Sequence, residues 1–278
     1  MKQTPYHGSV HTHSTFCDGK NSMAEMAAAA CAAGVRYYGF SGHSHTNVPA
    51  DQGVCMAADL TAYRAEGQRL QREYQGRMEI LLGIEWDLYA DAPVPDWAEY
   101  WIGSVHNLLD TRSGSYYTMD WKPEALRACR DEMFGGDMTA LLKCYFASVA
   151  AMAEKEPDIL GHIDLVTKLN GDGSFFDETD AAYRAAALDA LHAADPARTL
   201  LEINTGAISR GYRVTPYPAR FLLEEWRRMG GQVILTADTH SADTILYAYD
   251  LSVKLALAAG YRESVLLTRN GWVACSLE

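Results

Sequence analysis

The residues with the clearest chemical potential in this sequence are histidines and carboxylates that directly follow short apolar segments. His11 and His13 are two apart on an expected strand, so both side chains point to the same side and can converge on one ion. Asp238 and His240 repeat this spacing near the other end of the chain. The candidate metal ligands are His11, His13, Asp18, His43, Glu85, His106, His162, Asp238 and His240.

Imidazole and carboxylate ligands together favour Zn, Mn or Fe(II). The set is larger than one ion requires, because an open catalytic site uses about three or four protein ligands. We therefore expect about two to three divalent metal ions, whose positive charge suits a phosphate dianion. Such ions lower the pKa of bound water towards neutrality, so that it can attack phosphorus without a serine or cysteine nucleophile.

The elements that must position these ligands alternate along the chain. Apolar segments such as YYGFSGH, EILLGIE and VILTADTH end in a candidate ligand, and most are followed by a stretch with helical character. This alternation is typical of βα units around a largely parallel sheet. Since barrels of this class build their sites at the carboxyl ends of the strands, one irregular barrel of about seven strands would gather all the ligands at one mouth.

Boundary signals locate the helices. A capping box that begins at Ser22 and a stop at Gly34 predict a helix over 22–33. Asp137 can cap another helix over 138–156. Further helices are expected to begin at Pro123 and to cover 58–74, 178–194, 216–229 and 241–259. After Glu85 the segment DLYADAPVPDWAEYW contains two prolines and is barely long enough for a crossover helix, so the regular pattern should break there.

Length and composition limit the classes of protein to consider. The 278 residues, 48% of them hydrophobic and 22% charged, fit a single α/β domain over 1–278. A net charge of -12 argues against a nucleic-acid partner. No apolar run approaches the ~20 residues that span a bilayer, so we expect no membrane partner and a cytoplasmic location. The six cysteines show no C-x-x-C spacing, and we expect them to be reduced and mostly structural.

The order of these motifs resembles one known family. HTHSTFCDG, YGFSGHS, GIEW, GSVH, GHIDLV, LEINT and ADTH follow one another as in the polymerase and histidinol phosphatase (PHP) superfamily, in its histidinol-phosphatase branch. The resemblance covers nearly the whole chain. It implies a distorted (β/α)7 barrel of the PHP type, usually with three metals, that hydrolyses L-histidinol phosphate to L-histidinol and phosphate in histidine biosynthesis.

The same resemblance implies how the ligands are shared among the metals. The first metal would take His11, His13, Glu85 and Asp238; the second Glu85 as a bridge with His106 and His162; and the third Asp18, His43 and His240. Glu85, Asp238 and His240 are the expected catalytic residues. Metal-bound water, His240 and Asp238 all remain candidates for protonating the leaving alkoxide.

Four other residues are candidates for contact with a small phosphorylated substrate. Lys168 and Arg210 can clamp the phosphate or the body of the substrate, and the segment around Arg210 resembles the substrate loop of histidinol phosphatases. His45 is either an active-site contact or a loop residue. Tyr117 belongs to an aromatic cluster that either closes over a ring-bearing substrate or packs within a loop.

Three other functions are compatible with parts of the pattern. A phosphoesterase of the same superfamily could act on another small phosphate ester, such as a nucleotide. An amidohydrolase barrel also begins with His-x-His, but it lacks the grouping of Asp18, His43 and His240 that would hold a third ion. A non-catalytic metal-binding or regulatory module would keep the fold as a scaffold.

Overall fold

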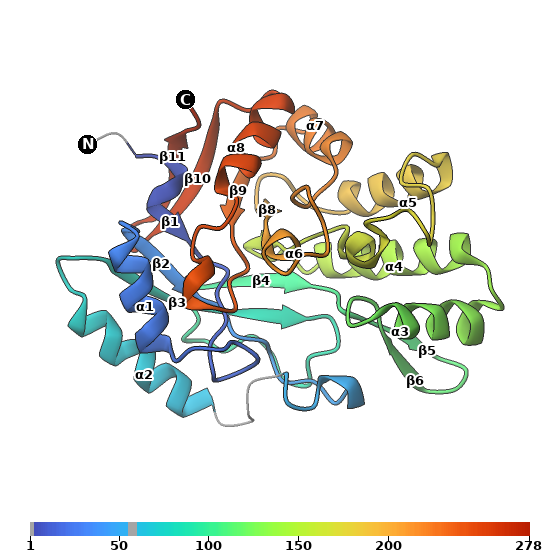
Figure 1. Cartoon of the computed structure of the whole chain (residues 1–278), viewed down its shortest axis with the longest axis horizontal. Coiled ribbons are helices and arrows are strands. Elements are labelled where there is room, and N and C mark those ends of the chain that lie inside the picture. The colour runs from blue at the N-terminus through green and yellow to red at the C-terminus, as the bar shows by residue number, and fades with distance from the viewer. Residues whose placement is uncertain (1–2, 55–59) are drawn as a thin grey trace.

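A curled, mostly parallel sheet forms the centre of the molecule. The computed structural model describes residues 3–54 and 60–278, and within them the main sheet has nine strands in the order β1-β2-β3-β4-β7-β8-β9-β10-β11 (Figure 1). Their bounds are β1 Gly8–Ser9, β2 Tyr37–Phe40, β3 Glu79–Asp87, β4 Tyr100–Ser104, β7 Ile159–Leu160, β8 Leu200–Asn204, β9 Val233–Thr236, β10 Glu263–Thr268 and β11 Gly271–Ser276. All neighbours pair in parallel except β10 and β11, which are antiparallel.

Backbone contacts beyond β1 and β9 bring the first and seventh parallel strands together. Thr12 forms a parallel bridge with Thr239. The amide of His13 donates to the Thr239 carbonyl at 2.8 Å, and the amide of Thr239 donates to the His11 carbonyl at 3.1 Å. The strands β1, β2, β3, β4, β7, β8 and β9 therefore form the predicted distorted seven-stranded barrel, and the β10–β11 hairpin extends the sheet beyond it.

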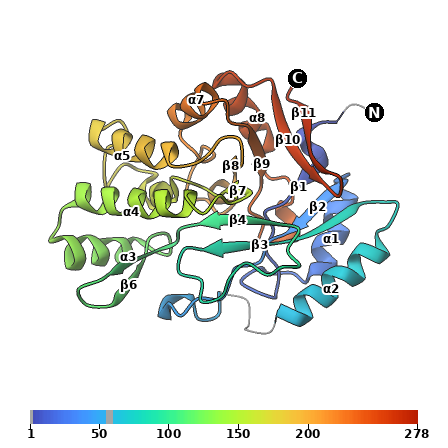
Figure 2. The same ribbon diagram turned by 180° about the vertical axis from the view of Figure 1, so that it is seen from behind.

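Helices cover the outside of this sheet. Their bounds are α1 Met23–Ala32, α2 Leu60–Glu73, α3 Pro123–Ala128, α4 Met138–Ala153, α5 Ala181–His192, α6 Gly206–Ser209, α7 Arg220–Arg228 and α8 Tyr249–Ala258. The short turns are η1 Pro5–His7, η2 Pro49–Asp51, η4 Leu165–Asn170 and η5 Ala242–Thr244, with a π turn, η3, at Cys129–Met133. Figures 1 and 2 show α1 and α2 on one flank of the sheet and α3, α4 and α5 on the other.

The predicted helix starts are confirmed where a capping side chain was identified. The Ser22 hydroxyl accepts from the Glu25 amide in a capping box, and Gly34 follows α1 with φ +82°. Asp137 accepts from the Ala140 amide at 3.0 Å and begins α4. The helix predicted over 58–74 is present from Leu60, and its first two residues lie outside the described residues.

The prediction of one continuous helix over 241–259 is wrong. The structure has the turn η5, then Ala248 in the left-handed region at φ +57°, and only then α8. Tertiary hydrogen bonds explain the break. Thr239 Oγ1 donates to the Thr244 carbonyl at 3.1 Å and Thr205 Oγ1 donates to the Tyr247 carbonyl at 2.7 Å, so both acceptors are used outside a helical ladder.

The connection between β3 and β4 lacks a helix in the described structure, as the two prolines predicted. The next connection contains more than a crossover helix. It contains an antiparallel hairpin of β5 (Asn107–Asp110) and β6 (Ser115–Thr118), followed by α3, η3 and α4. This hairpin returns the chain towards the carboxyl ends of the barrel strands, where His106 follows β4.

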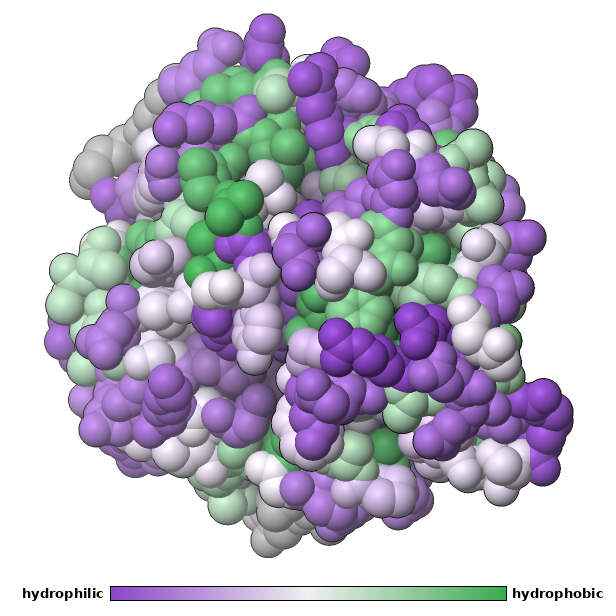
Figure 3. All heavy atoms as spheres, turned by 45° about the vertical axis from the view of Figure 1, so that its right-hand side comes forward, coloured by the Kyte–Doolittle hydropathy of each residue, from purple (hydrophilic) through white to green (hydrophobic). Residues whose placement is uncertain are grey.

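The core lies between the sheet and its helices, where Trp226, Tyr145 and Leu201 are almost completely buried. The five described cysteines are free, and Cys55 lies outside the described residues. Within the described residues, no helix is both long and apolar enough to span a membrane. In the face shown in Figure 3, hydrophilic side chains surround smaller hydrophobic areas.

Candidate active site

The structure brings all nine predicted ligands together at the carboxyl ends of the barrel strands. His11 and His13 follow β1, His43 follows β2 and Glu85 lies within β3. The others follow β4, β7 and β9, except Asp18, which lies on the loop after His13. The ligand atoms form four overlapping groups in which all members lie within 4.8 Å of one another.

The first predicted group is compact and buried. His11 Nε2 and His13 Nε2 lie 3.3 Å and 3.4 Å from Glu85 Oε2. Asp238 Oδ1 closes the group at 3.3 Å from His13 Nε2 and 3.7 Å from His11 Nε2. Side-chain exposure is 0% for both histidines, 1% for Glu85 and 6% for Asp238. Four largely buried ligand atoms thus converge on one point.

Glu85 also faces the second predicted group. Its other oxygen, Oε1, lies 3.0 Å from His162 Nε2 and 3.3 Å from His106 Nε2. Each oxygen of one carboxylate therefore faces a different set of histidines. This is the arrangement expected of a carboxylate that bridges two ions.

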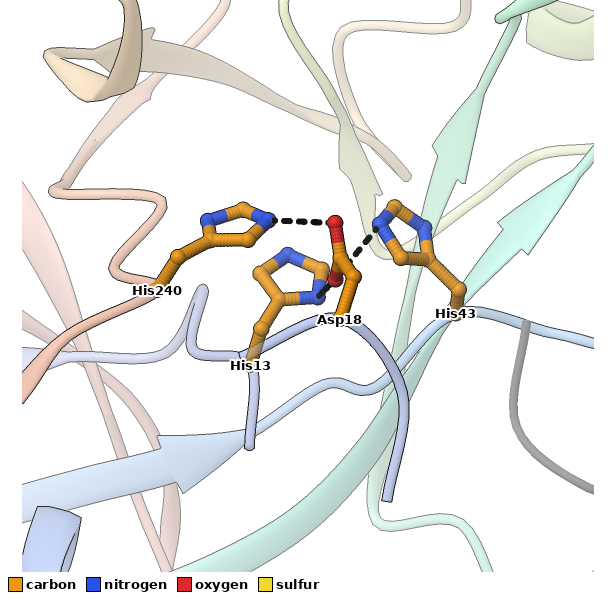
Figure 4. Close-up of side chains that lie close together, drawn as sticks. All are labelled: His13, Asp18, His43 and His240. Carbon is orange, nitrogen blue, oxygen red and sulfur yellow. Dashed lines mark ion pairs between the residues drawn. The ribbon is translucent and has the colours of Figure 1, made fainter. Parts of the chain in front are cut away.

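Asp18 is at the centre of the third group. Figure 4 shows its carboxylate between His43 and His240, with His13 beside it. Oδ1 lies 3.5 Å from His43 Nε2 and 3.7 Å from His13 Nδ1, and Oδ2 lies 3.2 Å from His240 Nε2. The His13 and His240 rings stack at 4.0 Å between centroids. His13, which was predicted only for the first group, thus also borders the third.

His43 connects the third group to the first. Its Nδ1 lies 3.0 Å from Glu85 Oε2, while its Nε2 faces Asp18. The three predicted groups are therefore continuous rather than separate sites.

Hydrogen bonding shows that this centre fits divalent cations. His11 Nδ1 lies 2.6 Å from Glu202 Oε1 and donates its proton to that carboxylate, so Nε2 presents a lone pair. In the described structure His11 Nε2, His13 Nε2 and Glu85 Oε2 are buried without a hydrogen-bond partner. Buried acceptors are rarely left unpaired, and a cation satisfies several converging acceptors at once.

The electrostatic potential supports the same conclusion. Burial by itself would lower the pKa of His11, but Glu202, Glu85 and Asp238 raise it well above its usual value. The carboxylates therefore create a strongly negative potential at His11. A divalent cation bound there would compensate it.

Comparison with known proteins agrees with this geometry. The PHP domain profile matches residues 9–206, a range that contains seven of the nine predicted ligands, from His11 to His162, and the LEINT strand. This chain belongs to the PHP domain family. Among curated PHP relatives, the histidinol-phosphatase of Bacillus subtilis (strain 168) is 27% identical over 268 residues, covering 86% of this chain and 96% of the relative.

Solved structures share the fold of this PHP protein. A Listeria monocytogenes structure has a TM-score of 0.72 and 18% identity, covering 87% of this chain and 98% of that one. The histidinol phosphate phosphatase of Lactococcus lactis, crystallised with Zn, L-histidinol and phosphate, has a TM-score of 0.65 and 20% identity, covering 94% and 96%.

Two further carboxylates hold ligands of the PHP site in place. Sequence reasoning had assigned no role to either of them. Glu202 Oε1 pairs with His11, and its Oε2 accepts from the His162 amide at 2.7 Å. Asp87 Oδ2 lies 3.1 Å from His106 Nδ1. The spacing of Asp87 from Glu85, two residues along one strand, repeats the spacing of His11 and His13 and was a usable signal. For Glu202 the sequence carried no comparable signal.

Replacing Glu202 should loosen the first metal position. We expect Glu202→Gln to weaken metal binding by about 10- to 100-fold, because the amide no longer fixes the His11 tautomer as a carboxylate does. Titration with a metal-sensitive chelator measures this affinity. Glu124→Gln, on the exposed start of α3, is the control and should bind metal like the wild type. Equal affinity in both variants would contradict the role of Glu202.

A cavity of about 390 Å³ opens over this centre. Lys168 and Arg210, the two predicted basic contacts, both line it. Arg210 Nη2 donates to Asp238 Oδ2 at 3.0 Å, and its Nη1 lies 2.8 Å from His240 Nδ1. Lys168 Nζ donates to Asp120 Oδ2 at 2.7 Å. Both cations are therefore held by partners on the cavity wall, Arg210 by two predicted ligands and Lys168 by Asp120.

The other two predicted substrate contacts lie elsewhere. His45 and Tyr117 are not among the described residues that line the cavity. His45 Nδ1 lies 2.8 Å from Asp91 Oδ2, and the Tyr117 hydroxyl donates to Glu132 Oε2 at 2.9 Å. Their polar atoms are thus directed to acidic partners outside the cavity, and the neighbouring Trp121 lines it instead.

Proposed function

We propose that this protein is a metal-dependent phosphomonoesterase that hydrolyses L-histidinol phosphate to L-histidinol and phosphate. The observation that carries this proposal is the set of ligands joined by Glu85 beneath a cavity that also holds Arg210 and Lys168. The name of the Bacillus subtilis relative and the ligands of the Lactococcus lactis structure support the choice of alcohol.

We further propose that one domain holds about two to three Zn, Mn or Fe ions. His11, His13, Glu85 and Asp238 would hold the first, His106 and His162 with Glu85 the second, and Asp18, His43 and His240 the third. When bound, these ions supply a nucleophilic water at neutral pH and neutralise the phosphoryl oxygens. Elemental analysis separates this proposal from a scaffold that holds no metal, and phosphate release separates it from a module that binds metal without catalysis.

The protein side chains orient the ester. The Arg210 guanidinium is planar and held by Asp238, so it can present its remaining donors to phosphate oxygens without losing its own orientation. Lys168 adds a second positive charge from η4. Asp238 and His240 line the same cavity, but as metal ligands that face the Arg210 donors both would offer lone pairs rather than protons. Water held by the ions would then be the remaining candidate for protonating the leaving alkoxide.

Removing the guanidinium should weaken substrate binding. We expect Arg210→Ala to lower kcat/KM about 10- to 100-fold, mainly through KM, because charge-assisted hydrogen bonds to phosphate are lost. Arg210→Lys should recover part of the loss. Steady-state phosphate release measures both, and Arg262→Ala, at an exposed arginine, serves as the control. An unchanged KM in Arg210→Ala would exclude a phosphate contact.

Substrate preference tests the proposed function. The experiment measures phosphate release from histidinol phosphate beside 5′-AMP, phosphotyrosine and a generic aryl phosphate. We expect the highest kcat/KM for histidinol phosphate. A preference for 5′-AMP would support a nucleotide phosphoesterase instead, and equal rates for histidinol phosphate and the aryl ester would contradict the named substrate.

A further inference from the structure

Asp120 is a carboxylate of the cavity wall that pairs with Lys168 but is not among the proposed metal ligands. It lies on the bend between β6 and α3, beside the exposed Trp121. Its side chain is 17% exposed and lines the cavity. The hairpin β5–β6 brings it there, since the Met119 amide donates to the His106 carbonyl at 2.8 Å.

Asp120 is ionised and paired on one side only. Burial by itself would raise its pKa, but the Lys168 ammonium and His106 lower that pKa to about 2. Its Oδ2 accepts from Lys168 Nζ at 2.7 Å. Over the described residues, no hydrogen bond to its Oδ1 is found, although a buried carboxylate ordinarily accepts several. One charged acceptor is therefore available to a ligand in the cavity.

Lys168 is fixed on its own side of the pair. It is 8% exposed, and its Nζ lies 5.2 Å from the centroid of the Tyr212 ring, which also lines the cavity. The pair thus presents a positive and a negative group to the same cavity at a fixed separation. Such a pair is complementary to a ligand that carries a phosphate and an ammonium close together.

The other charged residues of the cavity wall that are not proposed metal ligands already have partners. Asp87 is paired with His106, and Arg210 is paired with Asp238. Asp51 Oδ2 accepts from Thr46 Oγ1 at 2.6 Å. Asp120 is therefore the cavity carboxylate best placed to meet a cationic part of the substrate.

We propose that Asp120 is a specificity-determining residue that binds the ammonium group of the substrate, which in L-histidinol phosphate is two carbon atoms away from the phosphate ester oxygen. This role rests on the proposed function, because Lys168 must face the phosphate while Asp120 faces the amine. The substrate class is then an amino-alcohol phosphate rather than any phosphomonoester. An ester without the amine leaves Asp120 buried and without its second partner, which disfavours binding.

Two phosphonates that the enzyme cannot hydrolyse test this role separately from turnover. 3-Aminopropylphosphonate reproduces the spacing between nitrogen and phosphorus, and propylphosphonate lacks only the amine. Calorimetry of the metal-loaded protein should give at least about tenfold tighter binding of the amino compound. In Asp120→Asn this preference should fall to about twofold or less. Asp250→Asn, at an exposed residue of α8, removes the same charge and should keep it.

Two results would overturn the proposal: equal binding of both phosphonates by the wild type, or an undiminished preference in Asp120→Asn. Since that variant leaves the Lys168 charge buried and unpaired, it could fail to fold. The double variant Asp120→Asn/Lys168→Gln then replaces it, with the same expected loss of preference. An amine preference that depends on Asp120 in a protein that fails to hydrolyse histidinol phosphate would contradict the phosphatase proposal but not the amine contact.

Discussion

Glu85→Ala should abolish phosphate release, with kcat reduced by at least about 10³-fold. Oε2 of Glu85 faces His11, His13 and His43, while Oε1 faces His106 and His162. Removing the side chain therefore removes a ligand from two metal positions at once. Phosphate release at saturating histidinol phosphate measures the loss, and elemental analysis should find fewer ions per chain.

The control for this variant is Glu124→Ala, which removes a carboxylate that is 68% exposed. It should retain wild-type turnover and metal content. Circular dichroism establishes that both variants are folded. Turnover close to wild type in folded Glu85→Ala would contradict the bridging role, whatever the metal content.

Metal removal should lower the thermal stability of the fold as well as its activity. Without cations, Glu85 Oε2, His11 Nε2 and His13 Nε2 are buried close together without hydrogen-bond partners in the described structure, which destabilises the native state. An ion whose free concentration is about 1,000 times its Kd stabilises the native state by about 4 kcal/mol. For a chain of this size, that corresponds to roughly 10 °C in Tm.

Differential scanning calorimetry before and after dialysis against a chelator measures this shift. Returning Zn or Mn should restore the original Tm. The variant Asp238→Asn, which removes one of the buried carboxylate charges, should show a smaller shift than the wild type. An identical Tm for the metal-free and metal-loaded protein would mean that these residues do not hold ions in the native state.

The ligand set was predictable because it depends on local regularities. Residues two apart on a strand share a side, as with His11 and His13, and the ends of parallel strands meet at one edge. The helix starts at Ser22 and Asp137 were predictable for the same reason, since a cap depends on the few residues that follow it.

Features set by contacts distant in sequence were not predictable. The break before α8 depends in part on the Thr205 hydroxyl, which donates to the Tyr247 carbonyl 42 residues further along the chain. The sequence left His45 open between an active-site contact and a loop residue, because its direction is set by Asp91, which is 46 residues away in the chain. Asp120 was overlooked because its position depends on a hairpin that the sequence pattern did not predict.

The roles of the two supporting carboxylates have a similar origin. Glu202 lies within β8 rather than at its end, and it becomes significant only because His11 and Thr236 approach it from other strands. Strand-end reasoning therefore finds residues that face the cavity. It does not find the residues behind them that fix a tautomer or an orientation.

Titrating the metal-free protein with divalent ions while recording phosphate release from histidinol phosphate tests metal-dependent hydrolysis most directly. We predict no release without metal and a rise to a plateau at about two to three ions per chain. Full activity in the metal-free protein, or a folded protein that binds the ions and releases no phosphate from this ester at any stoichiometry, would contradict the proposed function.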